Sequence, residues 1–162
     1  MAHSFSKLWT HVILATRNSL PFLGETVEQR VYDHIQQHLK DIGCPVLIVN
    51  GMPDHVHGLF LLSPQRSVAE VTKLVKEDAE HWINEQEELA QYCHQHTGQP
   101  FSWHSGYAAY SVSESIVDTM YQYIKNQKRH HQQNDFWEEY DSFNSLYRRK
   151  QLTQQKKTSD RS

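Results

Sequence analysis

Two histidines, His55 and His57, stand two residues apart in a stretch with the apolar content of a β-strand. Successive side chains of a strand point to opposite faces, so both imidazoles share one face, with Cα atoms roughly 6–7 Å apart. That spacing lets both rings reach one metal ion, while Val56 and Phe60 point the other way, toward a core. A metal held by this pair would indicate an enzyme.

Chance also produces histidine pairs, because the chain contains 12 histidines. His94 and His96 have the same spacing in a polar segment, and we interpret them as solvated. His55 and His57 differ because their strand is otherwise apolar. A lone His-x-His pattern is only moderately specific, so a purely structural role for the pair stays open on this evidence alone.

A second candidate pair, Tyr123 and Gln127, lies near the end of the last predicted helix, residues 115–131. The i,i+4 spacing stacks both side chains on one side of a helix, at the edge of its apolar stripe. From there they could reach a neighbouring site and still touch solvent. The helical wheel alone favours the simpler alternative, in which an amphipathic tyrosine closes the core.

The elements that must position these residues follow the order β-α-β-β-α-β-α. The strands are expected at residues 8–16, 46–49, 55–62 and 107–112, and the helices at residues 27–42, 67–83 and 115–131. The first six elements match the ferredoxin-like (split βαβ, RRM-like) α+β pattern: an antiparallel sheet with helices on one face, plus a C-terminal helix.

Local signals refine this outline. Asn50-Gly51 is typical of a two-residue hairpin turn, and Ser67 with Glu70 forms a capping box at a helix start. The polar segment 86–105 is expected to be a surface loop. We expect one domain over residues 1–147, followed by a basic, flexible tail over residues 148–162.

Size and composition fit a globular protein. The 162 residues are 38% hydrophobic and 22% charged, enough for one domain with a core. No apolar run approaches the roughly 20 residues of a membrane span, and the N-terminus lacks the features of a signal peptide. A cytoplasmic location is therefore expected. Cys44 and Cys93 are too few and too far apart for a disulfide framework or a cysteine-built zinc site.

Charge is distributed unevenly along the chain. The formal net charge of −3 argues weakly against a nucleic-acid partner, but acidic residues crowd the middle and basic residues the last third. Candidates for phosphate contacts there are Lys125, Lys128, Arg129, Arg148, Arg149 and Lys150. The alternative for this basic group, and for His130 and His131 within it, is an ordinary solvated surface.

Three segments occur in one order along the chain: Pro53-Asp-His55-Val-His57-Gly-Leu, Gly106-Tyr-Ala-Ala-Tyr-Ser-Val-Ser113, and Tyr123-Ile-Lys-Asn-Gln127-Lys-Arg-His-His131. Together they resemble the single-tyrosine HUH transposases of small bacterial insertion sequences, including their REP-associated tyrosine transposase relatives. HUH stands for His–hydrophobe–His, here His55, Val56 and His57. The resemblance covers about residues 6–147. Each motif alone is weak; the three in order, with the expected fold, are strong.

The resemblance implies a specific chemistry. Tyr123 matches the nucleophile that attacks a single-stranded DNA phosphodiester, giving a 5′-phosphotyrosine link and a free 3′-OH. His55, His57 and Gln127 match the three metal ligands. The implied metal is Mg²⁺ or Mn²⁺; imidazole ligands make Mn²⁺ the more natural fit.

The resemblance also implies partners. Single-stranded DNA with hairpins at the element ends would be the substrate, and action would be associated with the nucleoid. A homodimer is implied, in which the tyrosine helix of one subunit completes the site of the other.

Three rivals remain. A domesticated or non-mobile protein of the same fold would nick or bind hairpin DNA with the same residues. A non-catalytic ferredoxin-like module would only bind nucleic acid. A zinc hydrolase would need another ligand and a general base, and the nearest carboxylate, Asp54, is expected to point away from the His55 face.

Overall fold

The computed structural model describes residues 4–130, with side chains as far as Lys128. The chain divides into two units, Met1–Arg129 and His130–Ser162, and the description below concerns the first. The predicted domain end at residue 147, the predicted tail 148–162 and residues Arg148, Arg149 and Lys150 lie outside the described residues, as does the side chain of Arg129.

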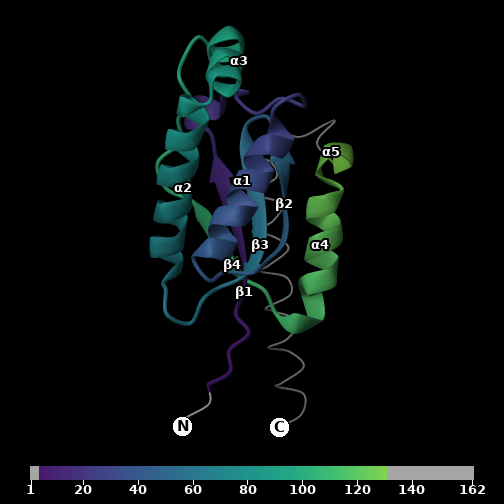
Figure 1. Cartoon of the computed structure of the whole chain (residues 1–162). Helices are drawn as coiled ribbons and strands as arrows, with labels where there is room; N and C mark the ends of the chain where they lie inside the picture. The colour runs from purple at the N-terminus through teal and green to yellow at the C-terminus, as the bar shows by residue number, and fades with distance from the viewer. Residues whose placement is uncertain (1–3, 131–162) are drawn as a thin grey trace. The chain divides into compact units, whose positions relative to one another are not determined.

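The elements follow one another in the predicted order, but η1 and α3 are added and the last predicted helix is divided into η2, α4 and α5. They are β1 (Trp9–Ala15), the 3-10 turn η1 (Arg17–Ser19), α1 (Glu28–Asp41), β2 (Val46–Met52), β3 (His55–Leu61), α2 (Val68–Glu85), α3 (Glu87–Thr97), β4 (Ala108–Ser111), η2 (Glu114–Ile116), α4 (Val117–Lys125) and α5 (Gln127–His130). The four strands form one antiparallel sheet in the order β2-β3-β1-β4 (Figure 1). This is the ferredoxin-like arrangement, so the predicted fold class is confirmed.

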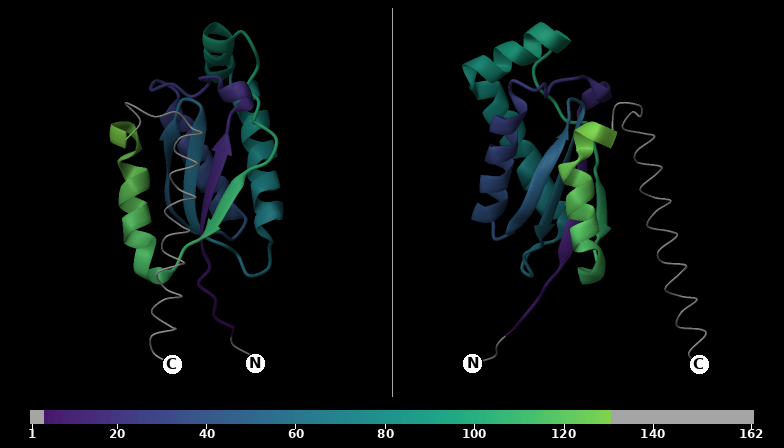
Figure 2. Two further views of the ribbon diagram at one scale, coloured as in Figure 1. Left: turned by 180° about the vertical axis from the view of Figure 1, so that it is seen from behind. Right: turned by 90° about the vertical axis from the view of Figure 1, so that its right-hand side faces the viewer.

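The two faces of the sheet have different coverings. Helices α1 and α2 lie on one face and α4 lies on the other (Figure 2). Because strand side chains alternate, β1 and β3 send one set of residues into the core beneath α1 and α2: Val12, Leu14, Val56 and Phe60. The alternate residues of β3, His55 and His57, therefore face the side that carries α4, as the strand pattern predicts.

The hairpin between β2 and β3 turns later than predicted. Asn50 and Gly51 are strand residues paired with His57 and Val56, and the turn is made by Pro53 and Asp54. The predicted Asn50-Gly51 turn is therefore wrong. Gly51 is a glycine for another reason, since a Cβ there would lie 2.2 Å from the carbonyl oxygen of His55.

Gly51→Ala is expected to lower the free energy of unfolding by about 1–3 kcal/mol, because the added methyl group meets backbone atoms that cannot yield cheaply. Gly58→Ala on β3 is the matched control, since its Cβ would make an ordinary 3.8 Å contact with the Phe60 ring and should shift stability by less than about 1 kcal/mol. Urea unfolding of both variants measures the difference. Equal stabilities would show that the β2–β3 hairpin has room at Gly51.

Helix α2 begins as the sequence predicts. The Ser67 hydroxyl accepts a hydrogen bond of 3.1 Å from the Glu70 backbone N–H, which satisfies one of the otherwise unpaired N–H groups of the first turn.

The expected loop over residues 86–105 is wrong in its first half, where α3 forms. Leu89 and Cys93, four residues apart, bury one face of α3, and Gly98 ends it in the left-handed conformation with φ 73°. Two buried positions in a segment rich in polar residues give too faint a helical period to predict a helix from the sequence. His94 and His96 are exposed, on a helix rather than in a loop. Burial raises the pKa of the Cys93 thiol to about 11, so this cysteine acts as a small apolar side chain.

The last predicted helix is not continuous. It begins with η2, continues as α4 and is interrupted at Asn126, whose φ and ψ of −95° and 18° depart from the helical values before α5. Tyr123 and Gln127 therefore flank a break. Among the described helices none is long and apolar enough to cross a membrane.

Candidate functional site on the histidine face of the sheet

The two histidines of β3 are fully buried and close together. His55 and His57 are 0% and 1% exposed, and their ring centroids are 5.1 Å apart with the planes at 72°. Burying an imidazole costs free energy unless its nitrogens are bonded. The convergence of two buried rings on one side of a strand is therefore the first mark of a functional site.

Each ring has a partner at its Nδ1 atom. His55 Nδ1 lies 2.7 Å from Asp54 Oδ1, and His57 Nδ1 lies 2.8 Å from His11 Nε2. The expectation that Asp54 points away from the His55 face is wrong, because Asp54 belongs to the hairpin turn and its side chain folds back onto the next residue. His11 was not predicted; its position on the same face of the neighbouring strand β1 as His57 was the available signal.

These hydrogen bonds determine which nitrogens face the site. With Nδ1 of each ring bound to an outer partner, Nε2 is the nitrogen that can act as a ligand, and the Nε2 atoms of both rings are buried, as is Oε1 of Gln127. A histidine that binds a metal characteristically donates its other N–H to a carboxylate or another acceptor. The donor set therefore fits a metal.

The fit also limits the kind of site. Within residues 4–130 no group of three or more His, Cys, Asp or Glu side chains is arranged to hold a metal ion. Among the described residues the further protein ligand would then be the neutral amide oxygen of Gln127, with water or an anionic oxygen of the substrate phosphate completing the set. A closed structural zinc site uses four protein ligands, so this arrangement favours an open site instead.

Helix α4 is fixed over the histidines at its C-terminal end. Asn50 pairs with His57 across the β2–β3 ladder, and its side-chain amide donates to the carbonyl oxygens of Ile124 and Lys125 at 2.9 and 3.3 Å. The last carbonyls of a helix need such donors. The cross-strand neighbour of His57 thus holds the turn of α4 that carries Tyr123.

The start of α4 is tied to β1. The Glu114 carboxylate in η2 accepts hydrogen bonds from the Lys7 ammonium at 2.5 Å and the Trp9 indole at 2.9 Å. Those two hydrogen bonds lower the pKa of the Glu114 carboxyl. Because this group is exposed, its role is to fix the direction of the chain entering α4 rather than to add much stability.

Tyr123 lies beside the histidine pair of its own chain. Its ring centroid is 6.4 Å from that of His57, with the planes at 68°, and the side chain is half-buried. The Tyr123 ring thus lies against the histidine pair, while part of its side chain stays exposed to solvent. The alternative drawn from the helical wheel, a tyrosine that only closes the core, does not account for the histidines beneath it.

Gln127 is fully buried, at 0% exposure, rather than at a solvent-touching stripe edge. The next residue, Lys128, donates from Nζ to the Gly51 carbonyl oxygen at 3.2 Å, so the segment after α4 lies against β2. The break at Asn126 turns the chain inward here. No distance fixes the Gln127 amide at the histidine pair, and its role as a ligand stays a prediction.

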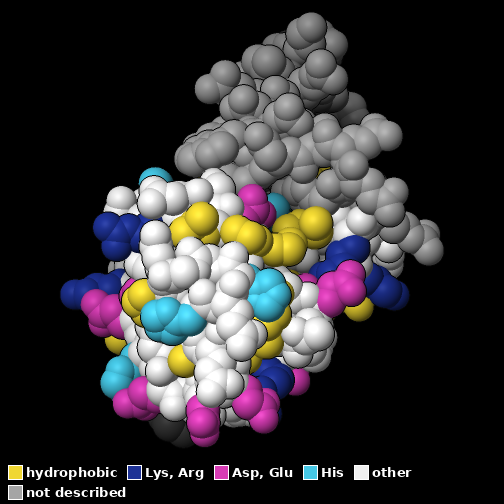
Figure 3. Space-filling model, turned by 90° about the horizontal axis from the view of Figure 1, so that it is seen from above, with side chains coloured by type: hydrophobic (Ala, Val, Ile, Leu, Met, Phe, Trp, Pro, Cys, Tyr) yellow, Lys and Arg dark blue, Asp and Glu magenta, His cyan; other side chains and the backbone are white. Residues whose placement is uncertain are grey.

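The candidate phosphate contacts differ in what they do within the first unit. Lys125 is exposed at the end of α4. Lys128 is held by Glu28, 2.9 Å away, and lies 5.8 Å from the centroid of the Tyr32 ring. Seen from above, the described part of the surface carries interspersed positive and negative side chains rather than one continuous basic patch (Figure 3). DNA contacts by these residues stay predictions.

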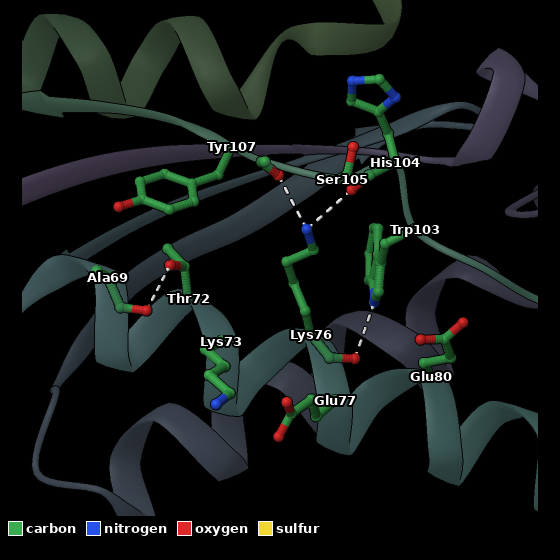
Figure 4. A pocket seen from close by; sticks show the side chains of 11 residues that line it. Ala69, Thr72, Lys73, Lys76, Glu77, Glu80, Trp103, His104, Ser105 and Tyr107 are labelled. Carbon is green, nitrogen blue, oxygen red and sulfur yellow. Dashed lines mark hydrogen bonds between the residues drawn. The ribbon is translucent and has the colours of Figure 1, made fainter.

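A hollow of about 380 Å³ lies between α2 and the segment before β4. Its central lysine, Lys76, donates to the carbonyl oxygens of His104 and Gly106 at 2.8 and 2.9 Å (Figure 4). Burial lowers the pKa of Lys76. This amine ties the 104–106 segment to α2, and the hollow lies across the sheet from the histidine face.

A family model matches most of the chain. The family model described as "Transposase IS200 like" matches residues 4–127, which include both histidines, Tyr123 and Gln127. None of the curated proteins compared gives a significant match.

Two solved structures resemble the chain. One is the crystal structure of a candidate transposase from Deinococcus radiodurans R1, at 25% identity and a TM-score of 0.60, covering 78% of this chain and 95% of that one. The other is a REP-associated tyrosine transposase bound to a REP hairpin, at 14% identity and a TM-score of 0.57, covering 82% of this chain and 73% of that one. At 14% identity, the similarity to the REP-associated transposase shows a shared fold only.

Proposed function

Because the chain belongs to the IS200-like transposase family, we propose that it cleaves and rejoins single-stranded DNA through a 5′-phosphotyrosine intermediate. The observation that carries the proposal is the position of Tyr123, whose ring lies 6.4 Å from that of His57. A phenol, two imidazoles and a buried amide on one face of the sheet match a phosphoryl-transfer site better than a core. A packed core would favour apolar residues there.

The reaction exchanges one phosphoester for another. The Tyr123 Oη atom attacks the scissile phosphorus, the new bond from Oη to phosphorus forms, and the bond from phosphorus to the 3′ oxygen breaks. The phenol loses its proton and the departing 3′ oxygen gains one, so no oxidant or energy-rich co-reactant is needed. A free 3′-OH then attacks the phosphotyrosine to rejoin the strands and release Tyr123.

The tyrosine needs assistance, since an unperturbed phenol has a pKa of about 10 and is mostly protonated at neutral pH. A divalent ion, when bound, supplies the Lewis-acid charge that polarises the phosphate and favours loss of the phenol proton. His55, His57 and Gln127 would hold it, and Mn²⁺ or Mg²⁺ is the proposed ion, with Mn²⁺ better suited to two nitrogen ligands. Asp54 holds His55 in position for this role.

The proposed substrate is single-stranded DNA that carries a hairpin. The fold is shared with a transposase bound to a REP hairpin, which supports hairpin recognition as the way the chain finds its cleavage site. The proposed phosphate-contacting residues are the basic ones named in the sequence analysis, Lys125, Lys128, Arg129, Arg148, Arg149 and Lys150. Action at the nucleoid follows from this substrate.

The test is a covalent adduct assay. With labelled single-stranded oligonucleotides from the flanks of its own gene and Mn²⁺, the wild-type protein is expected to form a protein–DNA adduct that persists on a denaturing gel. Excess EDTA should reduce the adduct to background, and readdition of Mn²⁺ should restore it. An adduct that forms equally well in EDTA would remove the metal from the proposal.

A protein of the same fold that only nicks or binds hairpins would use the same residues. Strand transfer separates the two: a transposase joins the cleaved strand to a second oligonucleotide, whereas a nicking protein leaves only the cleaved product. A hairpin-specific mobility shift without any adduct would favour the binding module.

A further inference from the structure

We propose that His11 is a positioning residue for the site, accepting a hydrogen bond from His57 and thereby directing the Nε2 lone pair of His57 toward the metal. The inference rests on the proposed function, in which His57 is a ligand. It adds a residue from a different strand, β1, to a site otherwise built from β3 and the segment around α4.

The contact between the two rings is close and shielded from water. His11 Nε2 lies 2.8 Å from His57 Nδ1, the ring planes are inclined by only 21°, and His11 is 0% exposed. The geometry follows from strand register, because Ile13 is paired with His57 and His11 is the next residue of β1 on the same face. Tyr110, the β4 partner of His11, lies 5.7 Å from it between ring centroids and limits its rotation.

The direction of this hydrogen bond follows from the chemistry of imidazole. A neutral histidine has one N–H donor and one lone pair, so a His57 that offers Nε2 to a metal carries its proton on Nδ1. That N–H must then donate to His11 Nε2, which requires the proton of neutral His11 to lie on its own Nδ1. One contact thus fixes the tautomers of both rings.

The choice of histidine rather than a carboxylate also has a physical reason. His55 already donates to the Asp54 carboxylate at 2.7 Å. A second carboxylate at position 11, 0% exposed, would put an uncompensated negative charge in a site that must accept a phosphodiester. A neutral ring accepts the hydrogen bond without that repulsion.

The test compares His11→Gln, whose amide oxygen can still accept a hydrogen bond, with His11→Leu, which has no acceptor. Val12→Ala is the control, because Val12 stands next to His11 on β1 but faces the core on the other side of the sheet. Ring ¹⁵N chemical shifts report the tautomer of His57 in the metal-free protein. The electron paramagnetic resonance signal of free Mn²⁺ reports metal affinity.

We expect His57 to be protonated at Nδ1 in the wild type and in His11→Gln, and to lose that preference in His11→Leu. Mn²⁺ affinity should fall about 10–100-fold in His11→Leu, recover to within a few-fold in His11→Gln and stay unchanged in Val12→Ala. A wild-type His57 protonated at Nε2, or wild-type Mn²⁺ affinity in folded His11→Leu, would overturn the inference. Should His11→Leu not fold, the wild-type shifts and His11→Gln still decide it.

The outcome is separable from that of the proposed function. If the wild type forms the DNA adduct and His11→Leu binds Mn²⁺ normally, the positioning role fails and the transposase proposal stands. If the wild type forms no adduct but His57 shows the Nδ1 proton and its dependence on His11, the positioning role stands without the cleavage chemistry.

Discussion

Tyr123→Phe is expected to abolish the covalent protein–DNA adduct, lowering its yield by at least about 10³-fold. The substitution removes only the phenol oxygen and leaves the ring that packs 6.4 Å from His57. No other hydroxyl can take over, because in-line attack on phosphorus requires the nucleophile at one position relative to the leaving group. Denaturing gels with labelled oligonucleotide and Mn²⁺ measure the adduct.

The matched control for this variant is Tyr121→Phe. Tyr121 lies two residues earlier on α4, about 200° around the helix from Tyr123, and should keep the wild-type yield. Hairpin binding on native gels should be unchanged in both variants, since the phenol acts in the chemical step and not in recognition. Adduct formation by Tyr123→Phe would show that another residue is the nucleophile and would contradict the proposed mechanism.

The face shared by His55 and His57 could be predicted from the sequence because strand alternation is a strict geometric rule. The fold class could also be predicted, because short apolar runs for the strands and a regular helical period between them leave few other element orders. The partners of the two rings could not be predicted in the same way. His11 meets His57 only through the register of β1 against β3, which depends on pairing between residues 46 positions apart.

Asn50 shows how a local signal can be misread. Asn-Gly is a strong turn sequence, yet here Asn50 faces α4 and binds the carbonyl oxygens of Ile124 and Lys125, while Gly51 allows the β2 and β3 backbones to approach. Pro53 and Asp54 supply the turn, and Asp54 also binds His55. The conformation of this hairpin therefore depends on contacts with α4 and with His55, which the local sequence does not show.

The same hairpin explains why the tyrosine reaches the histidines of its own chain. Asn50 pairs with His57 on one side and holds the end of α4 on the other, so the position of Tyr123 is coupled to the strand that carries the ligands. The homodimer implied by the family resemblance stays a prediction, but these contacts within one chain favour a tyrosine that acts on its own histidines over the exchange of the tyrosine helix between subunits. Whether Tyr123 acts on the histidines of its own chain or on those of a partner subunit can be tested by mixing two inactive variants.

Mixing His57→Ala protein with Tyr123→Phe protein is expected to give no adduct. Each protein lacks one half of the site, and if the two halves belong to one chain, no mixture can contain a complete site. If the helix is exchanged in a two-fold dimer, random mixing in equal amounts restores about one quarter of the sites. Adduct yields after co-refolding, compared with wild type treated identically, separate these results. A yield near one quarter would show that Tyr123 acts on the partner's histidines and that the Asn50 contact re-forms between subunits.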